Sequence, residues 1–215
     1  MSNPKLTPAQ HLARLGDHLS RVAAFYGFRS YAALWNEPSN ARLRTERHNP
    51  NILAAGDPIA IPELAIREVD RSTEQRHRFR VQLPELVVRF EFQSWDGKPV
   101  KDAPKDVRVD GKPAEFTAPG SGKVEVPVTP LSDRCSVAFP KGEVLGRVGF
   151  LQPASTLAGQ RQRLNNLGYD AGEANDPAEL QRRSAVEEFQ CDRGLLVDGK
   201  CGPKTQAALQ RAHGC

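Results

Sequence analysis

The sequence has few aromatic residues, one methionine and no long hydrophobic run. Phe, Trp and Tyr make up 7% of its 215 residues, and hydrophobic residues of all kinds make up 39%. A chain of this length holds two domains or three small ones. The low aromatic content favours several modest cores over one large core. Because no stretch of 18 apolar residues occurs, we expect no membrane-spanning segment.

Strong charge of one sign is also missing. The formal net charge is +4, which is too small an excess to predict a nucleic-acid-binding surface. The first 20 residues, MSNPKLTPAQHLARLGDHLS, lack the apolar core of a signal peptide. We therefore expect synthesis in the cytoplasm without a signal peptide, and export by another route if the protein acts in the periplasm or outside the cell.

Cysteine is scarce, and three of the four cysteines lie close to the C-terminal end. These are Cys191, Cys201 and Cys215, whereas Cys135 stands alone in a strand-like run and is expected to be a buried apolar position. The close cysteine pairs of structural zinc sites are absent, so we expect no metal and no other cofactor. A disulfide between Cys191 and Cys201, or between Cys201 and Cys215, would form only after export from a reducing cytosol.

The segment 10–64 is predicted to fold as strand, helix, helix, strand. Turn signals and Pro62 bracket a short strand at Pro58–Ile61, and its expected partner is a strand near His11–Leu15. Between them, two stretches place apolar residues on one helical face, the second with Ser30 as its N-cap. The expected face residues are Leu19, Val22, Ala23, Tyr26, Tyr31, Leu34 and Trp35.

This order, together with GDHLSRVAAFYG, LWN and NPNILAAGDPIAIP, resembles the LysM domain over about residues 10–63. The resemblance implies binding of glycans that contain N-acetylglucosamine, such as peptidoglycan, between two loops. His18 replaces the usual Thr or Ser, and the stretch before Leu53 is longer than usual. Without the resemblance, Gly16-Asp17 and Gly56-Asp57 are only turn formers. Carried over, the glycan-binding residues are Gly16, Asp17, His18, Leu19, Asn51, Ile52, Leu53 and Ala54.

The segment 74–151 is predicted to be a small antiparallel β domain, sandwich-like in form. HRFRVQL, LVVRFEFQSW, VEVPV, CSVAF and RVGFL all have strand-like composition, and SWDGKPV and RVDGKPA carry Asp-Gly hairpin turns. Arg76, Arg78 and Arg80 would share one strand face, which we interpret as solvated surface.

The segment 155–215 is predicted to be a three-helix domain. Ser155 or Thr156 would cap the first helix, Asp176 and Pro177 would begin the second, and Pro203 would begin the third. The expected first-helix face includes Leu157, and that of the second includes Leu180. The expected common core is Leu164, Leu167, Phe189, Leu195, Val197 and Leu209.

The pieces QRLNNLGY, AVEEFQ and GLLVDGKCGPKTQAAL resemble the small three-helix peptidoglycan-binding domain found beside cell-wall hydrolases. The chain lacks that family's first Asp-Gly turn and has DAGEANDPAELQRRS in its place. The resemblance implies a ligand surface that includes Tyr169, Asp170, Asp198 and Gly199. Read without it, Asp198 and Gly199 are scaffold residues of a turn.

The whole chain is predicted to be α+β and non-enzymatic. It has no nucleophile elbow, no H-E-x-x-H and no phosphate loop. One hypothesis is a protein that binds cell-wall glycan. A second follows from a resemblance of the module order to accessory proteins of type VI secretion and other contractile machines, whose partner would be a spike, baseplate or toxin protein. In that case the two modules act as protein adaptors. A hydrolase centred on the β domain is the third alternative.

Overall fold

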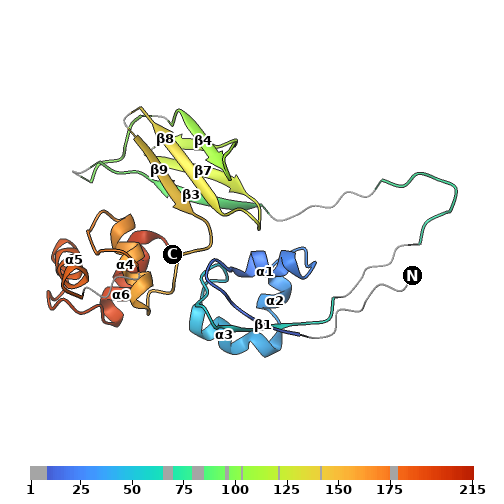
Figure 1. Cartoon of the computed structure of the whole chain (residues 1–215), viewed down its shortest axis with the longest axis horizontal. Helices are drawn as coiled ribbons and strands as arrows, with labels where there is room; N and C mark the ends of the chain where they lie inside the picture. Colours follow the sequence, from blue (N-terminus) through green and yellow to red (C-terminus); the bar gives the residue numbers. More distant parts are fainter. Residues whose placement is uncertain are drawn as a thin grey trace.

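The chain folds as an α+β protein, as predicted, in three successive units (Figure 1). The computed structural model describes residues 9–64, 70–78, 85–94, 97–102, 104–120, 122–140, 142–174 and 179–215. We call the part from β1 to β2 the N-terminal unit, that from β3 to β9 the β unit, and that from α4 to α6 the C-terminal unit. Each unit has its own hydrophobic cluster.

The N-terminal unit packs short helices on a two-stranded sheet. Strand β1 (Ala9–Leu12) pairs antiparallel with β2 (Pro58–Ile61), so the first strand begins earlier than the predicted His11–Leu15. Helix α1 (Leu19–Phe25) follows the prediction, but the second predicted helix is broken. A proline disfavours helical backbone at the residue before it, and Pro38 breaks that helix. The pieces are α2 (Ala32–Trp35), the 3-10 turn η1 (Pro38–Asn40) and α3 (Ala41–Arg47).

The core of the N-terminal unit contains the predicted face residues together with one buried amide. Leu19, Leu34 and Ile59 are fully buried. The side chain of Asn40 is also buried, and it bonds both backbone groups of Ala60, with its Nδ2 2.9 Å from the carbonyl oxygen and its Oδ1 2.8 Å from the amide nitrogen. Asn40 therefore supplies hydrogen-bond partners for backbone groups on the edge of β2 that β1 does not pair.

The β unit is a sandwich of two antiparallel sheets. One sheet has the order β3-β7-β6 and the other has the order β5-β4-β8-β9. Val107, Val124, Val126, Cys135 and Val137 are buried in its cluster, so the expected burial of Cys135 is confirmed. The strands are β3 (Leu86–Glu91), β4 (Asp106–Val109), β5 (Lys112–Pro113), β6 (Thr117–Gly120), β7 (Lys123–Val128), β8 (Arg134–Phe139) and β9 (Gly142–Arg147).

The Asp-Gly turn in RVDGKPA forms the predicted hairpin between β4 and β5. Asp110 and Gly111 have φ values of 51° and 79°, the pair of left-handed conformations that a type I′ turn requires. The prediction of a strand in RVGFL was wrong: β9 ends at Arg147, and Phe150 belongs to the connection toward α4. Residues 79–83 of the expected strand HRFRVQL, including Arg80, lie outside the described residues, as does the centre of SWDGKPV, and Arg76 and Arg78 are not in a strand.

The C-terminal unit contains the three predicted helices, α4 (Leu157–Asn166), α5 (Glu179–Asp192) and α6 (Pro203–His213). Thr156 is the N-cap of α4, with its hydroxyl oxygen 3.0 Å from the amide nitrogen of Gly159. The expected cap of α5 at Asp176 and Pro177 lies outside the described residues. None of the helices in the described part of the chain is both long and apolar enough for a membrane span.

Three apolar residues expected on the core side of the C-terminal unit are exposed instead. Leu157 is 56% exposed, Leu180 is 84% exposed and Val197 is 51% exposed. Buried polar side chains, among them Gln160, Arg163 and Gln190, take the interior space in this unit. The helical spacing of apolar residues therefore overestimated how much of this core is hydrocarbon.

Arg21 of α1 joins the N-terminal unit to the β unit. Its Nη2 donates to the carbonyl oxygen of Ser132 at 2.9 Å and to Oδ1 of Asp133 at 2.6 Å. Its Nε lies 3.3 Å from the carbonyl oxygen of Pro130. One planar guanidinium thus donates hydrogen bonds to both the backbone and a carboxylate of the turn before β8.

We expect Asn40→Ala to lower the free energy of unfolding by about 2–4 kcal/mol, because it leaves the backbone N–H and C=O of Ala60 without partners. Urea denaturation followed by circular dichroism measures this change. The matched control is Ser39→Ala, which changes an exposed neighbour and should cost less than about 0.5 kcal/mol. Equal stability of the two variants would contradict the role given to Asn40.

Candidate functional site

The loop between α5 and α6 is held by the buried side chain of Gln190. Its Oε1 accepts from the amides of Asp198 and Gly199, both at 3.0 Å. Its Nε2 lies 2.9 Å from Oδ1 of Asp198, 3.0 Å from the carbonyl oxygen of Lys200 and 3.1 Å from Oγ1 of Thr205. One residue of α5 thereby fixes both the loop and the first turn of α6.

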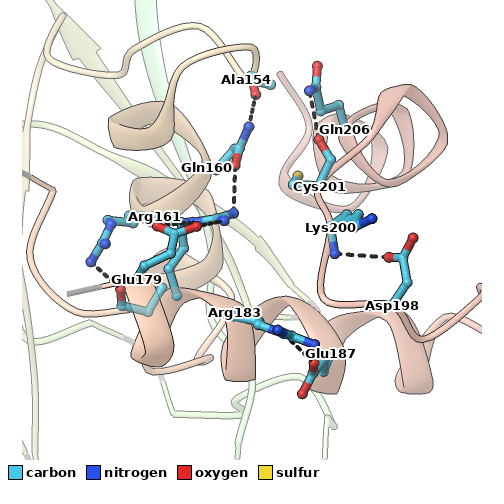
Figure 2. A network of polar contacts seen from close by, with 12 residues as sticks. Ala154, Gln160, Arg161, Glu179, Arg183, Glu187, Asp198, Lys200, Cys201 and Gln206 are labelled. Carbon is cyan, nitrogen blue, oxygen red and sulfur yellow. Dashed lines mark hydrogen bonds and ion pairs between the residues drawn. The ribbon is translucent and has the colours of Figure 1, made fainter. Parts of the chain in front are cut away.

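Asp198 and Gly199, predicted for the ligand surface, have scaffold roles. Oδ1 of Asp198 accepts from the Lys200 amide at 2.9 Å (Figure 2). Hydrogen bonds from Gln190 and from that amide hold the pKa of Asp198 below its ordinary value. Gly199 is buried, and a Cβ there would lie 2.6 Å from Cγ of Arg183. The turn interpretation of these two residues is therefore the one that the contacts favour.

Tyr169 and Asp170 lie on a different side of α5. The Tyr169 hydroxyl donates to Asp192 at 2.9 Å, and Nε2 of Gln181 donates to Asp170 at 2.7 Å. Burial, followed by the hydrogen bond with Asp192, raises the pKa of Tyr169 to about 12.

The four residues of the predicted second surface therefore do not come together. Gln181 and Asp192 are eleven residues apart, about three helical turns, and so share one side of α5. Arg183 and Glu187, which contact Gly199, lie on the opposite side of the same helix. Figure 2 shows the Arg183–Glu187 ion pair and, separately, the contact between Lys200 and Asp198 in the loop. Tyr169 and Asp170 therefore lie on one side of α5, and Asp198 and Gly199 lie on the other.

The α5–α6 loop presents two apolar side chains to solvent that the sequence did not single out as site residues. Leu196 is 80% exposed and Val197 is 51% exposed. They directly precede Asp198, whose backbone and carboxylate are fixed by Gln190. Exposed apolar side chains on a backbone held this way form a preorganised contact surface.

Buried arginines tie the C-terminal unit to its flanking segments. Nη1 of Arg163 donates to the carbonyl oxygens of Gln152 at 2.6 Å and Gly159 at 3.0 Å, and its Nε donates to that of Cys215 at 3.0 Å. Burial lowers the pKa of Arg163. Arg182 forms an ion pair with Glu179 and donates to Gln160. Gln160 itself donates to the carbonyl oxygen of Ala154 at 3.1 Å (Figure 2). These arginines use most of their donors inside the fold, but among the described residues the buried Nη2 of Arg163 has no hydrogen-bond partner.

The cysteines of the C-terminal unit are free thiols in the structure, which contains no bridge among Cys191, Cys201 and Cys215. A Cys201–Cys215 bridge does not fit this fold. Helix α6 runs between the two residues for 11 residues, roughly 16 Å, whereas a disulfide needs Cα atoms within about 7 Å. A Cys191–Cys201 bridge formed after export stays a prediction.

Cys215 contacts His213, but the pair does not have the character of an activated thiol. The Cys215 sulfur lies 3.0 Å from Nδ1 of His213. Burial raises the pKa of Cys215, and burial together with the charge of Arg163 lowers that of His213 to about 4. Reactive cysteines have a depressed pKa, so this contact is between a neutral thiol and a neutral ring. Over the described residues there is also no cluster of three or more His, Cys, Asp or Glu side chains suited to a metal ion.

The two predicted loops of the N-terminal unit meet in space, as expected. The Leu19 amide donates to the carbonyl oxygen of Pro50 at 3.0 Å, and the Ser20 hydroxyl donates to Oδ1 of Asn51 at 3.2 Å. Most of the predicted contact residues are nevertheless hidden, because His18, Leu19, Ile52 and Leu53 are at most 7% exposed. Asn51 is exposed, while Asp17 and Ala54 are half-buried.

The connection that follows β9 covers this meeting point. A Cβ built at Gly16, whose φ is +94°, would lie 2.8 Å from Cζ of Phe150. A Cβ at Gly149 would lie 2.6 Å from Cδ2 of His18. Only glycine allows so close an approach at these two positions. The sequence did not indicate this contact, because Phe150 was assigned to a strand.

His18 is buried against this connection without complete hydrogen bonding. His18 is only 4% exposed, and no group in the described part of the chain forms a hydrogen bond with its Nε2. Burial, and then the nearby charge of Arg21, lower the pKa of His18 to about 4, against the opposing effects of Asp17 and Asn51. The ring is therefore neutral near pH 7.

Comparison with known proteins finds a similarity in one part of the chain. Residues 160–209, from within α4 to within α6, match the family described as "Putative peptidoglycan binding domain". No curated protein and no solved structure matches the chain. The match supports cell-wall binding by the C-terminal unit. The LysM resemblance of the N-terminal unit and the resemblance to contractile-machine proteins stay predictions.

We expect Gln190→Ala to destabilise the C-terminal unit by at least about 3 kcal/mol, because it removes the partner of several buried loop groups at once. The free energy of unfolding in urea reports this loss. Glu188→Ala, an exposed change two residues earlier on α5, is the control and should be nearly neutral. A similar stability in both variants would show that the loop does not depend on Gln190.

We also expect acid to destabilise the fold through His18. The unfolded chain binds a proton near the ordinary value of 6.5, but the folded chain does so only near pH 4. Between these values the unfolded state holds more protons, so stability falls as the pH falls. For this one group the loss from pH 7 to pH 5 is roughly 2 kcal/mol.

Comparing unfolding free energies at pH 7 and pH 5 for the wild type and His18→Asn measures this contribution, because the variant should lack it. His48→Asn is the matched control, since it replaces an exposed histidine at positive φ with a residue that tolerates that conformation. It should keep the wild-type dependence. The same pH dependence in His18→Asn and the wild type would contradict the assignment to His18.

Proposed function

We propose that the protein is a non-catalytic cell-wall-binding protein whose C-terminal unit binds peptidoglycan. The observation that carries this proposal is the family match over 160–209. It coincides with α4, α5, α6 and the loop that Gln190 holds. The neutral thiol and imidazole of Cys215 and His213 support binding rather than nucleophilic chemistry.

The surface that we assign to the wall is the α5–α6 loop. Sugar rings offer apolar faces, and Leu196 and Val197 are apolar side chains held in solvent by a fixed loop. Tyr169, on the other side of α5, uses its ring and its hydroxyl in contacts within the fold. Its ring packs edge-on against Phe189 with centroids 5.6 Å apart, and its hydroxyl is bonded to Asp192.

A second candidate role is that of a protein adaptor. The specific observation in its favour is that the chain's own Gly149 and Phe150 occupy the meeting point of the N-terminal loops. In this role the N-terminal unit is a protein-binding scaffold, and the partner is a spike, baseplate or toxin protein of a type VI or other contractile machine. Such a machine is also the export route that we propose for a wall binder made in the cytoplasm.

Retention on purified peptidoglycan sacculi tests the wall-binding proposal. We expect the full chain to sediment with sacculi and Leu196→Ser to reduce the bound fraction several-fold. Leu180→Ser is the matched control, because Leu180 is 84% exposed and Leu196 80% exposed, but Leu180 lies at the other end of α5. It should bind like the wild type.

Absence of retention for the wild type would reject wall binding and leave the adaptor role. Equal retention of both leucine variants would move the binding surface away from the α5–α6 loop. Release of soluble reducing ends or free amines from the sacculi would contradict a non-catalytic role.

A further inference from the structure

The connection between β9 and α4 is held in place from both of its sides. The tip of the Phe150 ring points at Gly16 of the N-terminal unit. The guanidinium carbon of Arg147 lies 3.5 Å from the centre of the same ring. This places a cation over the aromatic face, a favourable contact in a partly desolvated position.

The C-terminal unit holds the backbone of the same connection. Nε2 of Gln162, on α4, donates to the carbonyl oxygen of Phe150 at 3.1 Å. Oε1 of Gln162 accepts from the Gln152 amide at 2.8 Å. A single side chain of the C-terminal unit therefore holds the backbone of the connection at Phe150 and at Gln152.

Where the connection contacts the N-terminal loops, one buried polar atom lacks a hydrogen bond. The His18 ring packs closely against Gly149, which has no side chain that could bond it. Among the described residues no group partners Nε2 of His18, although the residue is only 4% exposed. Leaving a buried polar atom without a partner costs free energy, because the hydrogen bonds that it made to water are not replaced. A ligand with a hydroxyl or amide group at this point would recover that energy.

We propose that Gly149 and Phe150 form an intramolecular cover over the N-terminal loops, and that an oligosaccharide with N-acetyl groups displaces it. This inference rests on the proposed function, because it names the wall glycan as the competing ligand. The apolar face of a pyranose ring replaces the Phe150 ring over Gly16. An amide or hydroxyl of the sugar pairs with Nε2 of His18, and the exposed Asn51, whose Oδ1 accepts from the Ser20 hydroxyl, lies at the same meeting point.

The cover makes the N-terminal site weak until the chain is already on the wall. When only a fraction of molecules is open, the apparent affinity falls by that fraction. Attachment through the C-terminal unit raises the local glycan concentration, which favours displacement of the cover.

Binding of a soluble N-acetylglucosamine hexamer to the full chain tests the cover, with calorimetry as the measurement. We expect Phe150→Ala to bind the hexamer at least tenfold more tightly than the wild type. Gln162→Ala keeps the Phe150 ring and all residues of the N-terminal unit but frees the connection, and it should also tighten binding. Leu145→Ala, which shortens a side chain on β9 that is 65% exposed, is the matched control and should equal the wild type.

Unchanged or weaker hexamer binding in both Phe150→Ala and Gln162→Ala would overturn the cover. Thermal melting of each variant shows whether it is folded. If Phe150→Ala does not fold, Gln162→Ala still tests the cover. Sedimentation with sacculi separates the two proposals. Normal sacculus binding with unchanged hexamer affinity rejects the cover alone, whereas tighter hexamer binding by the variants without sacculus retention rejects only wall binding by the C-terminal unit.

Discussion

The buried amide of Gln190 is the interaction on which the C-terminal unit depends. The side chain is 1% exposed and contacts backbone groups of the α5–α6 loop from both its oxygen and its nitrogen. Asn40 does the same for β2 in the N-terminal unit. Small domains bury too little apolar surface to be stable by a wide margin. In this chain, buried side-chain amides that bond the backbone help to stabilise units whose apolar cores are small. A buried amide stabilises a fold only when its hydrogen bonds are complete.

The connection through Phe150 gives the chain a physical link between its units. Arg21 holds the N-terminal unit to the turn before β8, and Gln162 holds the start of the C-terminal unit to the same connection that touches Gly16. A ligand that shifts the backbone at Phe150 changes the Gln162 contacts as well. By linkage, any free-energy coupling between the two units acts equally in both directions.

The sequence predicted what depends on local spacing and left unpredicted what depends on distant contacts. The strand at Pro58–Ile61, the face of α1 and the Asp-Gly hairpin follow from periodicity and turn chemistry. Gln190 is a polar residue in a helix, which a pattern assigns to solvent, and its burial depends on a loop that follows it. Phe150 was assigned to a strand because RVGFL alternates, and only the folded chain shows its contact with Gly16. The four residues proposed for one ligand surface separated for the same reason, since α5 passes between them.

The α5–α6 loop and the N-terminal loops differ in how much free energy a ligand needs to reach them, because the first is exposed and the second is covered. The apolar side chains Leu196 and Val197 already lie in solvent on a loop that needs no rearrangement, so a ligand there pays little to order the protein. At the N-terminal loops a ligand must first remove a packed phenyl ring and its cation contact. The gain available in return is a partner for Nε2 of His18 and a new apolar contact. On the two proposals made above, the exposed loop is therefore suited to first attachment, and the covered site to a contact that forms only where glycan is concentrated.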